Sequence, residues 1–144
     1  MSDPTLYDRD FYAWTAEQAE LLRERRFAEV DLEHITEEIE SMGRSEKREL
    51  VSRLTVLLLH LLKWQFQPVR QGPSWRLSIA TTRDALADHL EENPSLRAVL
   101  EASIGVAYRR ARRNAAVETG LAEHNFPATC VWSTDQLLGE DFWP

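Results

Sequence analysis

The sequence feature that most constrains the fold is a pair of adjacent helical segments with opposite characters. The first, residues 31–42 (DLEHITEEIESM), carries five acidic residues and no lysine or arginine. The second, residues 45–67, has an apolar centre at residues 56–64 (VLLLHLLKW). A helix that is apolar on nearly every side must be surrounded by other elements. The second segment is therefore predicted to form the centre of a helical bundle.

Glycine, proline and capping residues predict where the helices end. We expect Gly43 to take the left-handed position that follows a helix end, and so to separate the two segments. Apolar spacing predicts further helices over residues 10–26, 74–92 and 94–119, and Gly120 is expected to end the last of them. A capping box at Ser133–Gln136 predicts a short helical turn near the C-terminus. The prediction is an all-α fold: a single-domain helical bundle over residues 1–144, with four to five main helices, a short C-terminal helical turn and an irregular tail.

Composition makes several classes of protein less favoured. The net charge is −7, and residues 1–50 hold 14 acidic against 7 basic side chains, which disfavours binding to nucleic acids and anionic membranes. Cys130 is the only cysteine, so neither an intramolecular disulfide nor a cysteine-based zinc cluster can form. The apolar run is interrupted by His60 and Lys63 and is too short to span a bilayer. The first ten residues do not resemble a secretory signal, so we expect a cytoplasmic protein without membrane contact.

Five strings, in this order, carry a family resemblance: LYDRDFYAW at 6–14, DLEHITEEIESMG at 31–43, HLLKWQFQP at 60–68, SW at 74–75 and DFWP at 141–144. Together they resemble the bacterial proteins grouped as domain of unknown function family 29. The resemblance covers nearly the whole chain. It implies an all-helical fold, a bacterial source and no assigned activity, and it supplies no catalytic residues.

Successive residues of a helix are rotated by about 100°, and this angle assigns each residue of the acidic segment to a face of its helix. Its apolar residues form one stripe, consisting of Leu32, Ile35, Ile39 and Met42. Glu33 and Glu37 point away from that stripe and should be solvated. Asp31, His34 and Glu38 form one edge beside it. Buried carboxylates need partners, so we expect an arginine at this edge, namely Arg53, Arg76 or Arg83.

The alternative is a divalent metal ion held between helices by Glu38, His34 and His60, with Asp31 on the same edge. Carboxylates and imidazoles on facing helices build such sites, although the chain lacks the Glu-x-x-His motif of di-iron bundles. Glu38 and His60 are also the candidates for acid–base catalysis. The favoured interpretation of His60, within LLLHLL, is a buried, hydrogen-bonded core histidine. No other cofactor is predicted.

Three hypotheses for function follow. The leading one is a non-catalytic helical binding protein that self-associates or binds a protein partner. The second is a metal-dependent or acid–base enzyme at the Glu38 edge. The third is nucleic-acid binding through Arg109, Arg110, Arg112 and Arg113, but the net charge favours a solvated face that meets the acidic N-terminal half.

Overall fold

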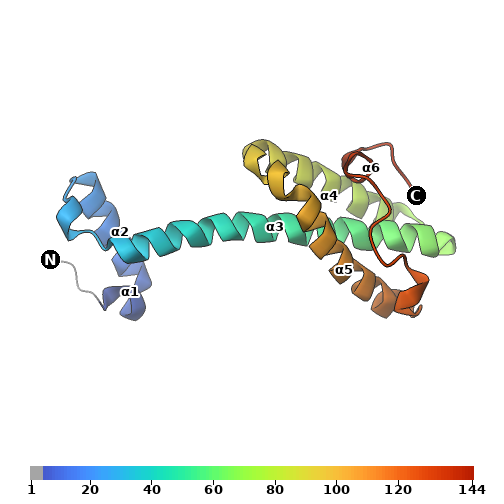
Figure 1. Cartoon of the computed structure of the whole chain (residues 1–144), viewed down its shortest axis with the longest axis horizontal. Helices are drawn as coiled ribbons and strands as arrows, with labels where there is room; N and C mark the ends of the chain where they lie inside the picture. The colour runs from blue at the N-terminus through green and yellow to red at the C-terminus, as the bar shows by residue number, and fades with distance from the viewer. Residues whose placement is uncertain (1–4) are drawn as a thin grey trace. The chain divides into compact units, whose positions relative to one another are not determined.

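The computed structural model describes residues 5–144, and these residues form helices and loops without any strand. The α-helices are, in chain order, α1 (Leu6–Arg9), α2 (Phe11–Arg23), α3 (Leu32–Phe66), α4 (Pro73–Glu92), α5 (Leu100–Thr119) and α6 (Thr134–Leu138). Short 3-10 turns lie in the connections that follow α2, α3, α4 and α5. Figure 1 labels the six α-helices. The all-α prediction is confirmed. Within the described part of the chain, no helix is long and apolar enough to cross a membrane.

The chain divides into two compact units, Met1–Ser45 and Glu46–Pro144. Unit 1 contains α1, α2 and the start of α3. Unit 2 contains the rest of α3 together with α4, α5 and α6. A single folding domain over residues 1–144 stays a prediction, because two compact units of one chain can still fold together.

The two segments expected on either side of Gly43 form one continuous helix of 35 residues, α3. The expected turn at Gly43 is therefore wrong. Among the described glycines, the one with a positive φ is Gly120, at +74°. An ion pair between Glu40 and Arg44, with 3.8 Å between nitrogen and oxygen, spans Gly43 at the i, i+4 spacing of a regular helix. Glycine permits a turn without enforcing one, and here the flanking residues continue the helix.

We expect Gly43→Ala to raise the free energy of unfolding by about 0.5–1 kcal/mol, because glycine inside a helix costs about that much relative to alanine. A Cβ at this position meets no other atom within 4 Å. Urea unfolding followed by circular dichroism measures the change. Gly120→Ala is the matched control and should be destabilising, because alanine is strained at a positive φ. A destabilised Gly43→Ala variant would mean that residue 43 is not helical.

The core of unit 2 lies between the second half of α3 and helices α4 and α5, which pack against it (Figure 1). Residues without any exposed surface include Leu54, Leu57, Leu58, Leu61 and Leu62 of α3, Ile79 and Leu86 of α4, and Ala107 and Ala111 of α5. The second segment is thus central, as predicted. It is not surrounded on every side, because Val56 is exposed and His60 is only half-buried. The His60 Nδ1 atom lies 2.8 Å from the backbone oxygen of Val56 on its own helix.

Several predicted helix ends are confirmed by their hydrogen bonds. The Asp10 side chain caps α2 by accepting from the backbone nitrogen of Ala13, and Gly120 ends α5 in the left-handed conformation. Ser133 and Gln136 form the predicted capping box of α6. In contrast, α4 begins one residue earlier than expected, with Pro73 as its first residue after Gly72.

The C-terminal segment is attached to α4 through Arg83. This side chain is only 3% exposed. Its Nε donates to the backbone oxygen of Leu137 at 2.9 Å, and its Nη2 donates to that of Gln136 at 3.3 Å. The guanidinium also lies 5.7 Å from the ring centre of Trp143. Arg83 therefore neutralises the carbonyl end of α6, where a cation is favourable.

Candidate functional site

In unit 1, polar and aromatic side chains converge on Asp31, the residue that precedes α3. Its carboxylate accepts hydrogen bonds from the indole Nε1 of Trp14 at 3.0 Å and from the Nδ1 of His34 at 2.7 Å. It also accepts one from the backbone nitrogen of His34 at 3.3 Å, which is the bond of a helix N-cap. The backbone nitrogen of Asp31 donates to the Gln18 side chain at 2.7 Å. Asp31 thus joins α2 to the start of α3.

Tyr7 of α1 completes this group, which we call the Asp31 cluster (Tyr7, Trp14, Asp31, His34 and Glu38). The Tyr7 hydroxyl donates to the Glu38 carboxylate. The Tyr7 ring stacks on the His34 ring with 3.9 Å between centres and 12° between planes, and it meets Trp14 edge-on at 4.9 Å. These contacts combine a charged network with aromatic packing, an arrangement that fixes side-chain positions.

The cluster changes the proton affinity of its members. Burial acts to raise the pKa of Asp31, but the hydrogen bonds from His34 and Trp14 outweigh it and hold that pKa below its ordinary value. The same bond to Asp31 raises the pKa of His34. The bond to Glu38 raises the pKa of Tyr7 to about 12. At neutral pH, Asp31 is therefore ionised and Tyr7 is a protonated donor.

The structure brings Asp31, His34 and Glu38 together, as the helical spacing predicts. The prediction of an arginine at this edge is wrong. Tyr7 and Trp14 of the same unit lie there instead, and they donate to the carboxylates of Glu38 and Asp31 respectively. The expected arginines bind elsewhere: Arg53 to Glu49, Arg76 against the rings of Trp64 and Trp143, and Arg83 to the carbonyls of α6. A metal-binding or catalytic role for Asp31, His34, Glu38 and His60 stays a prediction.

The apolar residues beside the cluster are largely uncovered. Leu32 is 68% exposed, Ile39 is 59% exposed and Met42 is 61% exposed, while Ile35 is half-buried. We call these four residues the α3 stripe. Glu33 and Glu37 are exposed, as expected. The sequence pattern identified an amphipathic helix face correctly, but the structure leaves that face open.

The arginine patch on α5 is divided between two environments. Arg112 donates to the backbone oxygen of Phe126 and lies 3.4 Å from a carboxylate oxygen of Glu123. Arg110 and Arg113 are exposed and line an open groove of about 420 Å³ with Ser52, Thr55 and Asn114. Nucleic-acid binding by this patch stays a prediction.

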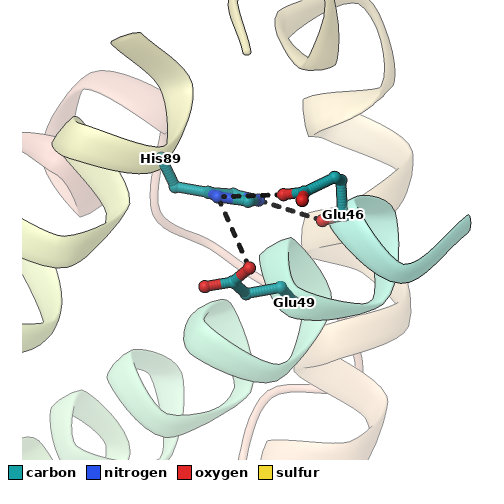
Figure 2. Close-up of side chains that lie close together, drawn as sticks. All are labelled: Glu46, Glu49 and His89. Atoms are coloured by element: carbon teal, nitrogen blue, oxygen red, sulfur yellow. Dashed lines mark hydrogen bonds and ion pairs between the residues drawn. The ribbon is translucent and has the colours of Figure 1, made fainter. Parts of the chain in front are cut away.

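One group with metal-ligand chemistry was missed by the sequence analysis. Glu46 and Glu49 of α3 and His89 of α4 place their ligand atoms within 4.8 Å of one another (Figure 2). The sequence contains the Glu-x-x-Glu spacing, which puts both carboxylates on one helix face. The third member comes from another helix, and no local pattern pairs His89 with that face.

These features define an all-α protein with a satisfied polar cluster, an open apolar helix face and a carboxylate–histidine group. Residues 6–143 match the family described as "Domain of unknown function DUF29", and the chain belongs to this family. The predicted family is thus confirmed. No curated protein and no solved structure shows significant similarity to the chain. The family description names no activity.

Proposed function

We propose that this protein is a non-catalytic helical binding protein, and that the α3 stripe docks an amphipathic helix of a partner protein. The observation that carries the proposal is the exposure of Leu32, Ile39 and Met42 within three turns of one helix face. Such a contiguous apolar face is typical of an interaction surface. The stripe follows the 3-4-3 spacing with which one helix packs lengthwise on another.

The chemistry of the surrounding residues indicates the charge of the partner. Residues 31–42 contain five acidic side chains and no lysine or arginine. Two of these carboxylates, Asp31 and Glu38, lie along one edge of the stripe inside the Asp31 cluster, while Glu33 and Glu37 are exposed on the far side of the same helix, so the whole segment is negative. A second copy of this chain would bring like charges together. A helix with basic residues beside its apolar face is complementary in both respects.

The proposal predicts that a synthetic amphipathic helix, with leucines at heptad positions and flanking lysines, binds the full-length protein. Ile39→Glu should weaken this binding at least about tenfold, since burying one large apolar side chain stabilises a complex by about 1.5–3 kcal/mol. Isothermal titration calorimetry at moderate salt measures both affinities. A peptide with the same leucines and flanking glutamates should not bind.

Val117→Glu is the matched control, because Val117 is an exposed apolar residue on α5 outside the stripe. This variant should bind the basic peptide as the wild type does. The design separates docking from general attraction between opposite charges, because Ile39→Glu adds a negative charge and would strengthen the latter. Unchanged or tighter binding by Ile39→Glu contradicts the proposal. Light scattering gives a second way to contradict the proposal. If the wild type is a dimer and Ile39→Glu dissociates it, the occupant of the stripe is a second copy of the chain.

A further inference from the structure

His89 is a buried side chain directed at two glutamates of a neighbouring helix. It lies on α4 and is only 4% exposed, between the buried residues Leu86 and Leu90. Its Nδ1 atom lies 3.6 Å from a carboxylate oxygen of Glu46 and 3.7 Å from one of Glu49 (Figure 2). Glu46 and Glu49 are one turn apart on α3, so both carboxylates reach the same side of the imidazole.

The hydrogen bond made by the other ring nitrogen, Nε2, determines which nitrogen of the imidazole carries the hydrogen. His89 Nε2 lies 2.9 Å from the backbone oxygen of Glu46. A carbonyl oxygen can only accept, so Nε2 carries the hydrogen. In the neutral imidazole, Nδ1 then presents a lone pair to two carboxylates. A lone pair facing anionic oxygens is repulsive unless a proton or a cation lies between them. Histidines that bind metals commonly have their second nitrogen fixed by a backbone carbonyl in this way.

We propose that Glu46, Glu49 and His89 bind a divalent transition-metal ion of the zinc type, each through one ligand atom. Two ligand atoms at about 2.1 Å from such an ion lie about 3–3.5 Å apart, close to the separations found around Nδ1. The glutamate side chains are 47% and 40% exposed, so they can rotate towards the ion, and the ion can enter from solvent. Imidazole and carboxylate together suit this class of metal.

Arg53 affects both the ionisation of Glu49 and the affinity of the site for a cation. It binds Oε1 of Glu49 through Nη2 at 2.5 Å and through Nε at 3.0 Å, which leaves Oε2 facing His89. This contact lowers the pKa of Glu49, so the carboxylate stays ionised. The guanidinium charge also opposes a cation. We therefore expect a moderate affinity, with a dissociation constant in the micromolar range.

The test is calorimetric titration of the untagged full-length protein with Zn²⁺ after removal of metals by chelator. The expected result is one Zn²⁺ per chain, with affinity reduced at least tenfold in Glu46→Gln and in Glu49→Gln. Both positions are partly exposed, so these variants should keep the fold, which circular dichroism checks. Glu40→Gln is the matched control, because Glu40 lies on the same helix outside the group. Zn²⁺ should raise the melting temperature of the wild type and of Glu40→Gln, but not that of Glu49→Gln.

Two outcomes overturn the proposal. In the first, the wild type takes up no stoichiometric Zn²⁺, which leaves a protonated His89 paired with the two glutamates as the reason for the geometry. In the second, Glu46→Gln and Glu49→Gln bind Zn²⁺ as tightly as the wild type, which places the ion at other histidines. Neither outcome depends on the α3 stripe, so the docking proposal is tested independently.

Discussion

Leu58→Ala should lower the free energy of unfolding by about 3 kcal/mol, within the range of about 2–5 kcal/mol for fully buried leucines. Leu58 lies in the second half of α3, has no exposed surface and belongs to the core shared with α4 and α5. The substitution removes apolar contacts and leaves a cavity, because the close-packed helices around it can relax only in part. Urea unfolding followed by tryptophan fluorescence measures the loss, with Trp64 of α3 as a reporter in the same unit.

Ile39→Ala is the control for this effect because it removes a similar side chain from the same helix. Ile39 is exposed, so its truncation should change the free energy of unfolding by no more than about 0.5 kcal/mol. If the two substitutions destabilised the protein equally, the stripe would be covered in solution, and the exposure on which docking depends would be absent. The comparison therefore tests the central contrast along α3.

Arg83→Ala should lower the free energy of unfolding by about 2–3 kcal/mol and release the segment around α6. The variant loses two charge-assisted hydrogen bonds to the carbonyls of Leu137 and Gln136, each contributing about 1.5–3 kcal/mol. Part of this loss is offset. Burial lowers the pKa of Arg83, which reflects the cost of placing a cation there, and its Nη1 has no hydrogen-bond partner among the described residues. The net effect is therefore smaller than the sum of the two bonds.

Hydrogen exchange over residues 134–143 measures this release directly. In the wild type these amides should exchange slowly, and in Arg83→Ala they should exchange much faster while the core amides of α3 keep most of their protection. Arg76→Ala is the control, because Arg76 also lies near the Trp143 ring but is exposed and makes no bond to α6. Slow exchange of the C-terminal segment in Arg83→Ala would show that Trp143 and Leu137 hold it without the arginine.

The parts of the fold that follow from local chemistry could be predicted from the sequence. Gly120 ends a helix because the residue after that end needs a positive φ, and the Ser133–Gln136 box depends only on residues three positions apart. Gly43 could not be decided in the same way. Glycine is compatible with both a turn and a helix interior, so the outcome depends on the flanking residues.

The candidate sites depended on partners that are distant in the sequence. Helical spacing correctly grouped Asp31, His34 and Glu38, because Asp31 caps the helix that contains the other two. Their actual partners, Tyr7 and Trp14, come from other helices, and an arginine was an equally valid chemical answer. His89 was missed for the same reason, because its orientation depends on a contact with the backbone oxygen of Glu46, which lies on another helix.

The open face of α3 also has an evolutionary consequence. A buried leucine such as Leu58 is retained because most replacements unfold the protein, and selection removes variants that fall below the stability threshold. Leu32, Ile39 and Met42 have no such protection, since a polar side chain at an exposed helix position costs the isolated protein almost nothing. Without a partner, random substitution would replace them with polar residues over time. Their apolar character would then persist among relatives only where something binds that face. Natural variation at these three positions would therefore show which relatives have kept the partner.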